Sequence, residues 1–329
     1  MFLKKFYDIY NIEYNNCLNK IKMKKYLRLF QNDTDYLDFK ETTDFILPNV
    51  SYCIQENHLH YNPLVDPYNS HAYVDLGLTS GTKWAKMNVG ASSETDAGLY
   101  FAWGETQGYT ASQVSGSATP HKDFSWNDYA LTEDNGSTMS KYNASDNKTH
   151  LELTDDAAAA NMGGDWHMPN RAQWLELFKE TKNGFVTNAG AFTQYAWDNT
   201  NGYSSPTTTT AAISGWDTAG YFFFKNTYTS VTDAITAEDY LFIPAAGYCG
   251  DGGVYNVGIS GGVWASALDS DYVKGAWDFY FDSDGAGVLY DSRYDGQSVR
   301  GVVGPMGEIT DETTPDEGGG GVTPIEPLS

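Results

Sequence analysis

The residues from Ala276 to Asp282 alternate strictly between two kinds of side chain, and this pattern constrains the fold more than any other in the sequence. The large apolar members are Trp277, Phe279 and Phe281, and the polar members are Asp278, Tyr280 and Asp282. Successive side chains of a β-strand point to opposite faces, so the alternation predicts a strand with one buried face. Other short apolar runs separated by Gly- and Asp-rich turns predict that residues 240–303 form a small antiparallel sheet.

The polar side of this predicted strand has an unusual composition. Asp and Tyr recur on it and around it, with almost no Lys. Tyr offers rigid contact area and Asp accepts hydrogen bonds, a combination typical of recognition surfaces. The sequence therefore favours a binding surface that includes Asp278, Tyr280 and Asp282, while a plain solvated face of an acidic protein stays open as the alternative.

Charge is distributed unevenly along the 329 residues. The net charge is −23 overall, but residues 1–28 hold seven Lys and Arg against two Asp and Glu. The remainder then carries 13 basic and 41 acidic residues, a net charge of −28. A body of this charge repels nucleic acid and anionic membranes, so neither is expected as a partner.

Cysteines and apolar runs restrict the cellular setting. Cys17, Cys53 and Cys249 are odd in number and far apart, which indicates free thiols rather than a disulfide framework. No apolar run approaches 18 residues, so no membrane insertion is expected. Polar residues interrupt the first 22 positions, which argues against a secretory signal.

Sequence motifs of catalysis and cofactor binding are missing. The chain has no dinucleotide-binding glycine motif, phosphate-binding loop, zinc-protease motif or nucleophile elbow, so we expect no enzyme and no cofactor. Residues 282–285 begin like a calcium loop but lack its third acid and closing Glu, so no metal site is expected.

Four regions follow from composition and periodicity. Residues 1–22 read as a basic amphipathic helix, although Met23 remains an alternative natural start. Residues 23–66 contain a predicted β-hairpin, with one strand around Val50–Ile54, another around Leu59–Tyr61, and then a linker. The main domain is expected over 72–304, and residues 305–329 read as a flexible acidic tail rich in Gly and Pro.

Within the main domain one helix has a clear local signal. Asn170 followed by Gln173 is a capping-box pattern, and Trp174, Leu177 and Phe178 form an apolar stripe behind it. Residues 99–105 read as an apolar strand. Residues 106–150 and 182–239 read as long polar insertions, the second broken by a strand at 221–225.

Six blocks in the main domain resemble a known family. They read VDLGLTSGTKWAKMNVGA, LYFAWGE, DDAAAANMGGDWHMPNRAQWLEL, YLFIPAAGY, VWAS and SVRGV, in this order over about 72–304. They are similar to the C-type lectin-like paralogous domains of Bacteroidetes and their phages, which also serve as targets of diversity-generating retroelements. The chain departs from the family pattern at Ala265, His167 and Gly301. The resemblance implies an α+β fold with its two ends close together and a ligand face on the final strands.

The same resemblance extends the expected ligand face beyond the alternating strand. It implies that neighbouring loops join the strand, so that the expected ligand-binding residues are Tyr255, Asp269, Asp271, Tyr272, Asp278, Tyr280, Asp282, Tyr290, Asp291 and Tyr294. The calcium-lectin triplets are missing from their usual places. The single Cys249 near the C-terminus speaks against the formylglycine-generating enzymes, which need paired cysteines.

A second resemblance covers residues 47–63, LPNVSYCIQENHLHYNP. It is similar to an N-terminal module of structural proteins of gut Bacteroides phages, including the crAss-like group. The residues that it implies for virion attachment are Pro48, Asn49, Val50, Tyr52, His60, Tyr61, Asn62 and Pro63.

Together these features predict a non-enzymatic phage virion protein: a head fibre, capsid decoration or tail-associated adhesion subunit. Residues 1–62 are expected to bind other virion proteins, and the lectin-like face a host surface glycan or protein, with the chain a homo-oligomer on the particle. A surface-anchored or secreted bacterial adhesin is the alternative, disfavoured by the missing signal peptide and lipid-attachment cysteine.

Overall fold

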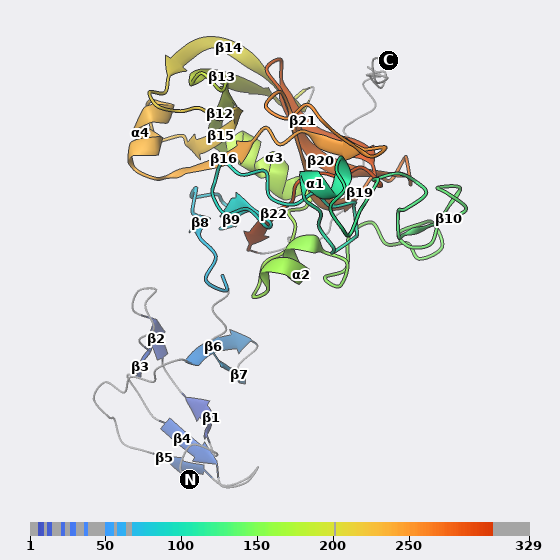
Figure 1. Ribbon diagram of the computed structural model, residues 1–329. Helices are drawn as coiled ribbons and strands as arrows, with labels where there is room; N and C mark the ends of the chain where they lie inside the picture. The colour runs from blue at the N-terminus through green and yellow to red at the C-terminus, as the bar shows by residue number, and fades with distance from the viewer. Residues whose placement is uncertain are drawn as a thin grey trace.

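The computed structural model describes residues 68–200 and 202–304 in full, together with the backbone strands of residues 1–63. The main domain is α+β, with strands predominating over short helices (Figure 1). Its centre is an eight-stranded sheet in the order β16-β15-β12-β13-β14-β21-β20-β19, and every neighbouring pair in it is antiparallel.

Two groups of strands meet in the middle of this sheet. The strands of the first group are β12 (Thr181–Val186), β13 (Ala191–Asp198), β14 (Tyr203–Ala212), β15 (Gly220–Lys225) and β16 (Tyr240–Pro244). Those of the second are β19 (Gly261–Leu268), β20 (Gly275–Phe281) and β21 (Ala286–Ser292). The groups join where Tyr203 pairs with Gly287 and Ser204 with Ala286.

The prediction that residues 182–239 form a polar insertion is wrong. These residues supply β12 to β15 almost entirely, and so about half of the central sheet. The physical reason is that β-branched Thr, abundant in β14, fits an extended strand as well as an apolar residue does. β14 is also largely exposed, so no apolar alternation marks it in the sequence.

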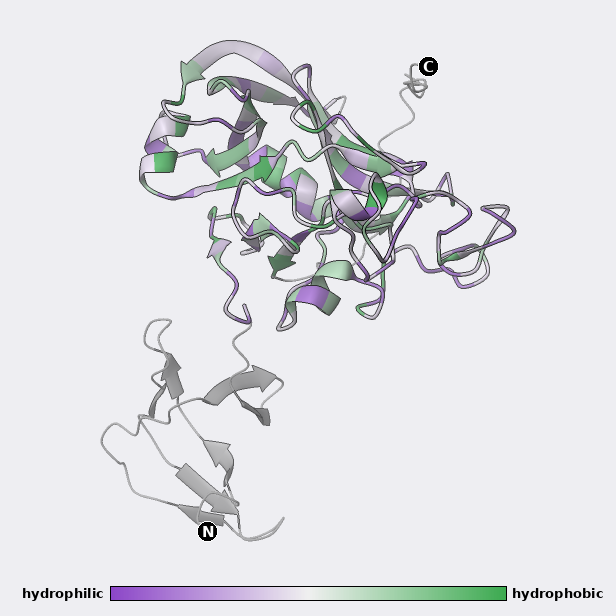
Figure 2. Ribbon diagram, in the orientation of Figure 1, coloured by the Kyte–Doolittle hydropathy of each residue, from purple (hydrophilic) through white to green (hydrophobic). Residues whose placement is uncertain are grey.

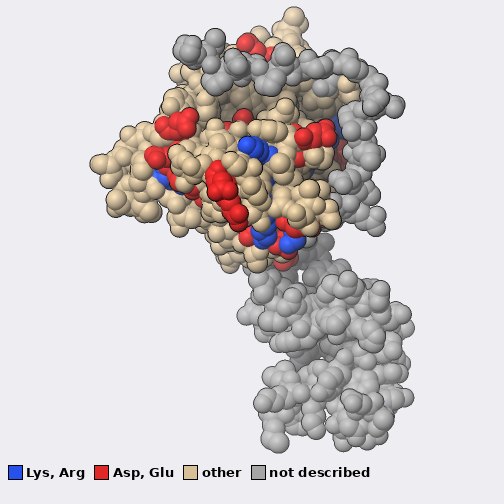
Figure 3. All heavy atoms as spheres, turned by 90° about the vertical axis from the view of Figure 1, so that its right-hand side faces the viewer, with Lys and Arg blue, Asp and Glu red and all other residues tan. Residues whose placement is uncertain are grey.

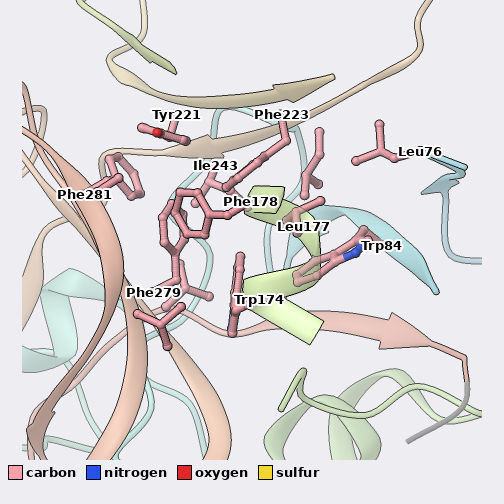
Figure 4. Packing of buried hydrophobic residues seen from close by; sticks show 14 of the residues in the cluster. Leu76, Trp84, Trp174, Leu177, Phe178, Tyr221, Phe223, Ile243, Phe279 and Phe281 are labelled. Carbon is pink, nitrogen blue, oxygen red and sulfur yellow. The ribbon is translucent and has the colours of Figure 1, made fainter. Parts of the chain in front are cut away.

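Helix α3 (Arg171–Glu180) lies against the central sheet, and its predicted cap and buried stripe are both confirmed. The Asn170 and Gln173 side chains cap each other's backbone reciprocally. Trp174 and Phe178 are fully buried, with their ring centroids 4.7 and 5.4 Å from that of Phe279 (Figure 4). The helix therefore packs directly beneath the alternating strand.

A small sheet joins the two ends of the described domain. β9 (Lys83–Asn88) pairs on one side with β8 (Tyr73–Val74) and on the other with β22 (Arg300–Val303). Arg300 is fully buried and donates hydrogen bonds to the Asn88 side chain and to the carbonyls of Ala85 and Phe242. The first and last strands of the described domain, β8 and β22, thus both pair with β9.

The segment 106–150 is a long excursion whose buried residues share a third core cluster with Tyr100, Ala246 and Cys249. It contains α1 (Ala111–Val114), β10 (Thr132–Glu133) and β11 (Thr138–Met139), and it is followed by α2 (Ala157–Met162). Residues 99–105, expected as a strand, form only isolated bridges, at Tyr100 and Phe101. The remaining elements are α4 (Val231–Thr236), β17 (Tyr248–Gly250) and β18 (Gly253–Tyr255). Apolar residues concentrate in the strands and helices, and polar ones in the long connections (Figure 2).

In the N-terminal region the structure gives strands. These are β1 (Phe6–Ile9), β2 (Ile12–Tyr14), β3 (Ile21–Met23), β4 (Leu27–Phe30), β5 (Tyr36–Asp38), β6 (Val50–Gln55) and β7 (His58–Pro63). The helix expected over 1–22 is therefore wrong, since its Phe, Tyr and Ile residues suit strands equally well. The hairpin is confirmed, because β6 pairs with β7 and Tyr52 lies opposite Tyr61.

Several N-terminal and C-terminal predictions lie outside the described residues. These concern Pro48, Asn49, the side chains of the other expected attachment residues, and the tail after residue 304. Among the described residues, no helix is both long and apolar enough to cross a membrane.

Candidate functional site

The alternation of the strand at 276–282 is confirmed, but the solvent exposure of its polar side is not. Phe279 and Phe281 are fully buried in the main core, as predicted. Asp278, on the other face of β20, is only 1% exposed, so its expected place on an open surface is wrong. Tyr280 and Asp282 are half-buried.

Two neighbours explain why Asp278 is covered. On β19 the buried Trp264 lies directly opposite it and packs in a second core cluster with Ala276. The segment after β21 then runs along the outer edge of β19, because Val263 bridges to Ser298 and the Ser298 amide donates to the Gly262 carbonyl, and it brings the buried Gln297 side chain to Asp278. Both faces of β19 and β20 are therefore packed.

The ten predicted ligand residues do not form one continuous patch. Tyr290 on β21 lies opposite Trp277 on β20, so its side chain is on the same face of the sheet as Trp277 and Phe279. Its ring centroid is 6.1 Å from those of Trp277 and Tyr272. Asp291, one residue further, points to the Asp278 face, since its partner is Ala276. Alternation along β21 thus divides the predicted site into two surfaces.

Four of the predicted acids and tyrosines organise turns. Asp269 is buried, not exposed as expected, and accepts a hydrogen bond from the Asp271 amide at the end of β19. The Tyr280 hydroxyl donates to Asp282 Oδ2 at 3.0 Å. Asp282 Oδ1 accepts from the amides of Asp284 and Gly285, closing the β20–β21 turn that resembles the start of a calcium loop.

A carboxylate cluster lies on the second face of β20, and we define it as Asp278, Asp291 and Asp295 with the amide of Gln297. The Gln297 Nε2 donates to Asp291 Oδ2 at 3.1 Å. Neither carboxylate oxygen of Asp278 has a hydrogen-bond partner, nor does Gln297 Oε1, and all three atoms are buried. Buried polar atoms are almost always paired in proteins, so this grouping is exceptional.

Desolvation raises the pKa of every carboxyl in the cluster, and the charge of Asp291 raises the pKa of Asp278 and Asp295 further. Desolvation raises the pKa of Asp291 to about 6. Desolvation, and then the charges of Asp291 and Asp251, raise the pKa of Asp295 to about 8. Burial and the charge of Asp291 raise the pKa of Asp278 well above its usual value, and the nearby Gln297 amide only partly opposes this. No ion pair of the described domain involves these three residues.

Two tyrosines lie within electrostatic reach of the cluster. The β17–β18 hairpin is tied to the 294–297 segment by paired hydrogen bonds between Cys249 and Gly296, at 2.7 and 2.8 Å. Tyr248 on this hairpin has its pKa raised by desolvation and by Asp295 and Asp291. Its ring centroid is 5.5 Å from that of Tyr255, which is 44% exposed. Desolvation and Asp295 likewise raise the pKa of Tyr294 to about 12.

We call the surface formed by the cluster and these tyrosines the acid–tyrosine surface. Its members are Tyr248, Asp251, Tyr255, Asp278, Asp291, Tyr294, Asp295 and Gln297. Sequence reasoning missed Tyr248, Asp251, Asp295 and Gln297, because Asp295-Gly296 and Asp251-Gly252 read only as turns. Acidic groups outnumber the few basic ones on the molecular side shown in Figure 3.

Two other features of the part of the chain that the structure describes bear on function. No group there of three or more His, Cys, Asp or Glu side chains could hold a metal ion. A cavity of about 270 Å³ lies between β9, α2 and residue 99, where His71, Met87 and Leu99 contribute to its lining. None of its lining residues belongs to the acid–tyrosine surface.

Comparisons with known proteins do not identify the site. No protein-family model, curated protein or solved structure matches this chain. The sequence blocks described above and the geometry of the acid–tyrosine surface are therefore the features that bear on function.

Proposed function

We propose that this chain is a non-enzymatic structural protein of a phage particle and that its main domain, of the C-type lectin-like class, binds a ligand on the host surface. The sequence resemblances over about 72–304 and 47–63 support this proposal. The pairing of β8 and β22 with the two edges of β9 supports it further, since the lectin-like class brings the two ends of its domain together.

The observation that carries the proposed binding function is the convergence of acids and tyrosines beside the last strands. The β17–β18 hairpin, β20, β21 and the segment 294–297 each contribute to the acid–tyrosine surface. Rigid aromatic side chains next to hydrogen-bonding groups are the usual composition of binding hot spots. Among the described residues, no ion pair engages its carboxylates.

The proposed location is tested on purified phage particles. Mass spectrometry of virions is expected to find the chain at a fixed copy number relative to the major capsid protein. A matched phage that encodes residues 63–329 only, without the basic N-terminal region, is expected to lose the chain from its particles. Recovery of the chain from bacterial membranes and not from virions would support a bacterial adhesin and contradict the proposal.

A further inference from the structure

The loop between β18 and β19 exposes large apolar side chains. Ile259 is 62% exposed and Val257 is 60% exposed, the highest values among the large apolar residues of the described domain. Tyr255 is 44% exposed, and every residue from 255 to 259 lies on the surface. Single exposed apolar residues are common in soluble proteins, but several on one short loop mark an interaction site. We call residues 255–259 the apolar loop.

Hydrogen bonds hold the backbone of the apolar loop in one conformation. The Gly258 amide donates to the Ala245 carbonyl at 2.7 Å, and the Ile259 amide donates to the Asn256 carbonyl at 2.9 Å. Asn256 and Gly258 have φ angles of 58° and 78°, a left-handed conformation that Asn and Gly adopt more readily than other residues. Binding therefore costs little backbone entropy, because Val257 and Ile259 are already held out toward solvent.

The apolar loop is continuous with the acid–tyrosine surface through Tyr255. This residue pairs with Tyr248 across β17 and β18, and the two ring centroids are 5.5 Å apart. Asp251 is exposed at the turn of the same hairpin, and Asp291 is exposed elsewhere on the acid–tyrosine surface. Residues 248–260 contain no Lys, Arg or His. The hairpin and the apolar loop therefore present apolar and negative groups together, without a positive side chain of their own.

We propose that the apolar loop binds a protein of the host surface that offers an apolar pocket with Lys or Arg at its rim, and this inference rests on the host-binding function proposed above. Such a pocket removes the exposed side chains of Val257 and Ile259 from water, which favours binding in proportion to the apolar area buried. Basic residues at the rim complement the exposed carboxylate of Asp251, which speeds association and favours the correct partner.

The same features disfavour three other partners. A glycan buried against Val257 and Ile259 gives up hydrogen bonds from its hydroxyls to water, and aliphatic side chains do not replace them. Loops and helices that bind a membrane surface carry Lys or Arg beside their apolar side chains, and residues 248–260 have neither. A second copy of the chain brings a body of the same negative charge, since residues 29–329 carry 13 basic and 41 acidic residues.

Treated host cells identify the chemical class of the partner. Labelled full-length protein is bound to untreated cells of the phage's bacterial host, to cells shaved with proteinase K and to cells oxidised with periodate. Shaving is expected to remove binding, and oxidation of the sugars is expected to leave it within about twofold of the untreated cells. Loss of binding after periodate, or binding that survives both treatments as a lipid ligand predicts, would overturn the inference while leaving host binding itself in place. No binding to untreated cells would overturn both proposals.

Substitutions locate the contact on the apolar loop. The double variant Val257→Thr, Ile259→Thr keeps β-branched side chains and adds hydroxyl groups, and it is expected to bind untreated cells at least tenfold more weakly. Leu153→Thr is the control, since it makes the same kind of change at a site 56% exposed outside the loop, and it is expected to bind as the wild type does. All variants are expected to melt as the wild type does, because the changed side chains are exposed. Wild-type affinity in the double variant contradicts the role of the loop.

Salt dependence tests the basic rim of the pocket. Asp251→Asn is expected to weaken cell binding about threefold in dilute salt and to make the affinity less sensitive to added salt, because exposed charge pairs are screened. A variant with the affinity and the salt dependence of the wild type would show that the partner has no basic rim at this position.

Discussion

Asp295→Asn is expected to make the protein more stable at neutral pH, although it removes a carboxylate that takes part in the proposed site. The pKa of Asp295 is raised to about 8 by desolvation and by Asp291 and Asp251. An Asp in the unfolded chain has a pKa of about 3.9. Below about pH 4 the carboxyl is protonated in both states. As the pH rises from 4 to 8, only the unfolded state loses its proton, so the stability of the folded state falls.

The magnitude follows from the two pKa values. Each pH unit between them is worth about 1.4 kcal/mol, so the full effect at pH 7 is about 4 kcal/mol for a carboxyl without solvent contact. Asp295 is only partly buried, and solvent screens part of its repulsion with Asp291. We therefore expect Asp295→Asn to raise the free energy of unfolding by about 1–3 kcal/mol at pH 7, or the melting temperature by roughly 3–10 °C.

Urea and thermal unfolding of the full-length protein at pH 4.5 and pH 7.5 measure this effect. The variant is expected to gain over the wild type at pH 7.5 and to differ little at pH 4.5. Asp75→Asn is a control of opposite sign, because the Lys83 ammonium and the Gly77 amide lower the pKa of Asp75, so its loss destabilises the protein at neutral pH. If Asp295→Asn destabilises the protein at pH 7.5, or shows the wild-type pH dependence, the cluster is not a site of like-charge repulsion.

The remaining predictions concern the core, the excursion and the N-terminal region. Phe279→Ala is expected to lower the free energy of unfolding in urea by about 3–5 kcal/mol, since the Phe279 ring is fully buried against α3. Its control is Leu153→Ala, at a site 56% exposed, which is expected to change that free energy by less than about 0.5 kcal/mol. Arg293→Lys is expected to lower the free energy of unfolding by at least about 2 kcal/mol and to speed proteolysis within 106–150. The reason is that the buried Arg293 guanidinium donates to Tyr129 and to three carbonyls and lies 4.7 Å from the Trp103 ring. Unchanged cleavage would refute that role. Deleting residues 1–62 is expected to leave the melting temperature of the main domain within about 2 °C of that of the full chain, because the described residues of this domain form core clusters among themselves. Near-ultraviolet circular dichroism measures the transition. Loss of the cooperative transition would show that the two regions fold together.

Elements with a local signal could be predicted from the sequence. The capping box at Asn170 and the stripe of Trp174 and Phe178 lie within a few residues of one another, and α3 forms as expected. The alternation around Phe279 is also local, because it follows from the backbone of one strand. The hairpin of β6 and β7 could also be predicted, because its two strands are neighbours in the sequence.

Burial on the second face of β20 could not be predicted in this way. It depends on Trp264, fourteen residues before Asp278, and on the segment that carries Gln297, nineteen residues after it. The carboxylate cluster is missed for the same reason, since Asp278, Asp291 and Asp295 meet only when β20, β21 and the following turn are in place. β14 escaped prediction because its Thr-rich, exposed sequence has no apolar period.

Binding of the labelled full-length protein to cells of the phage's bacterial host tests the central claim most directly. Tyr255 and Tyr272 are a matched pair, since both are tyrosines 44% exposed, but only Tyr255 belongs to the acid–tyrosine surface. Loss of an aromatic hot spot typically costs about 2 kcal/mol, or roughly thirtyfold in affinity. Our account predicts that wild type and Tyr272→Ala bind the cells equally and that Tyr255→Ala binds at least tenfold more weakly, with all three melting alike. Equal cell binding by Tyr255→Ala and wild type, or no binding by any of the three, would contradict it.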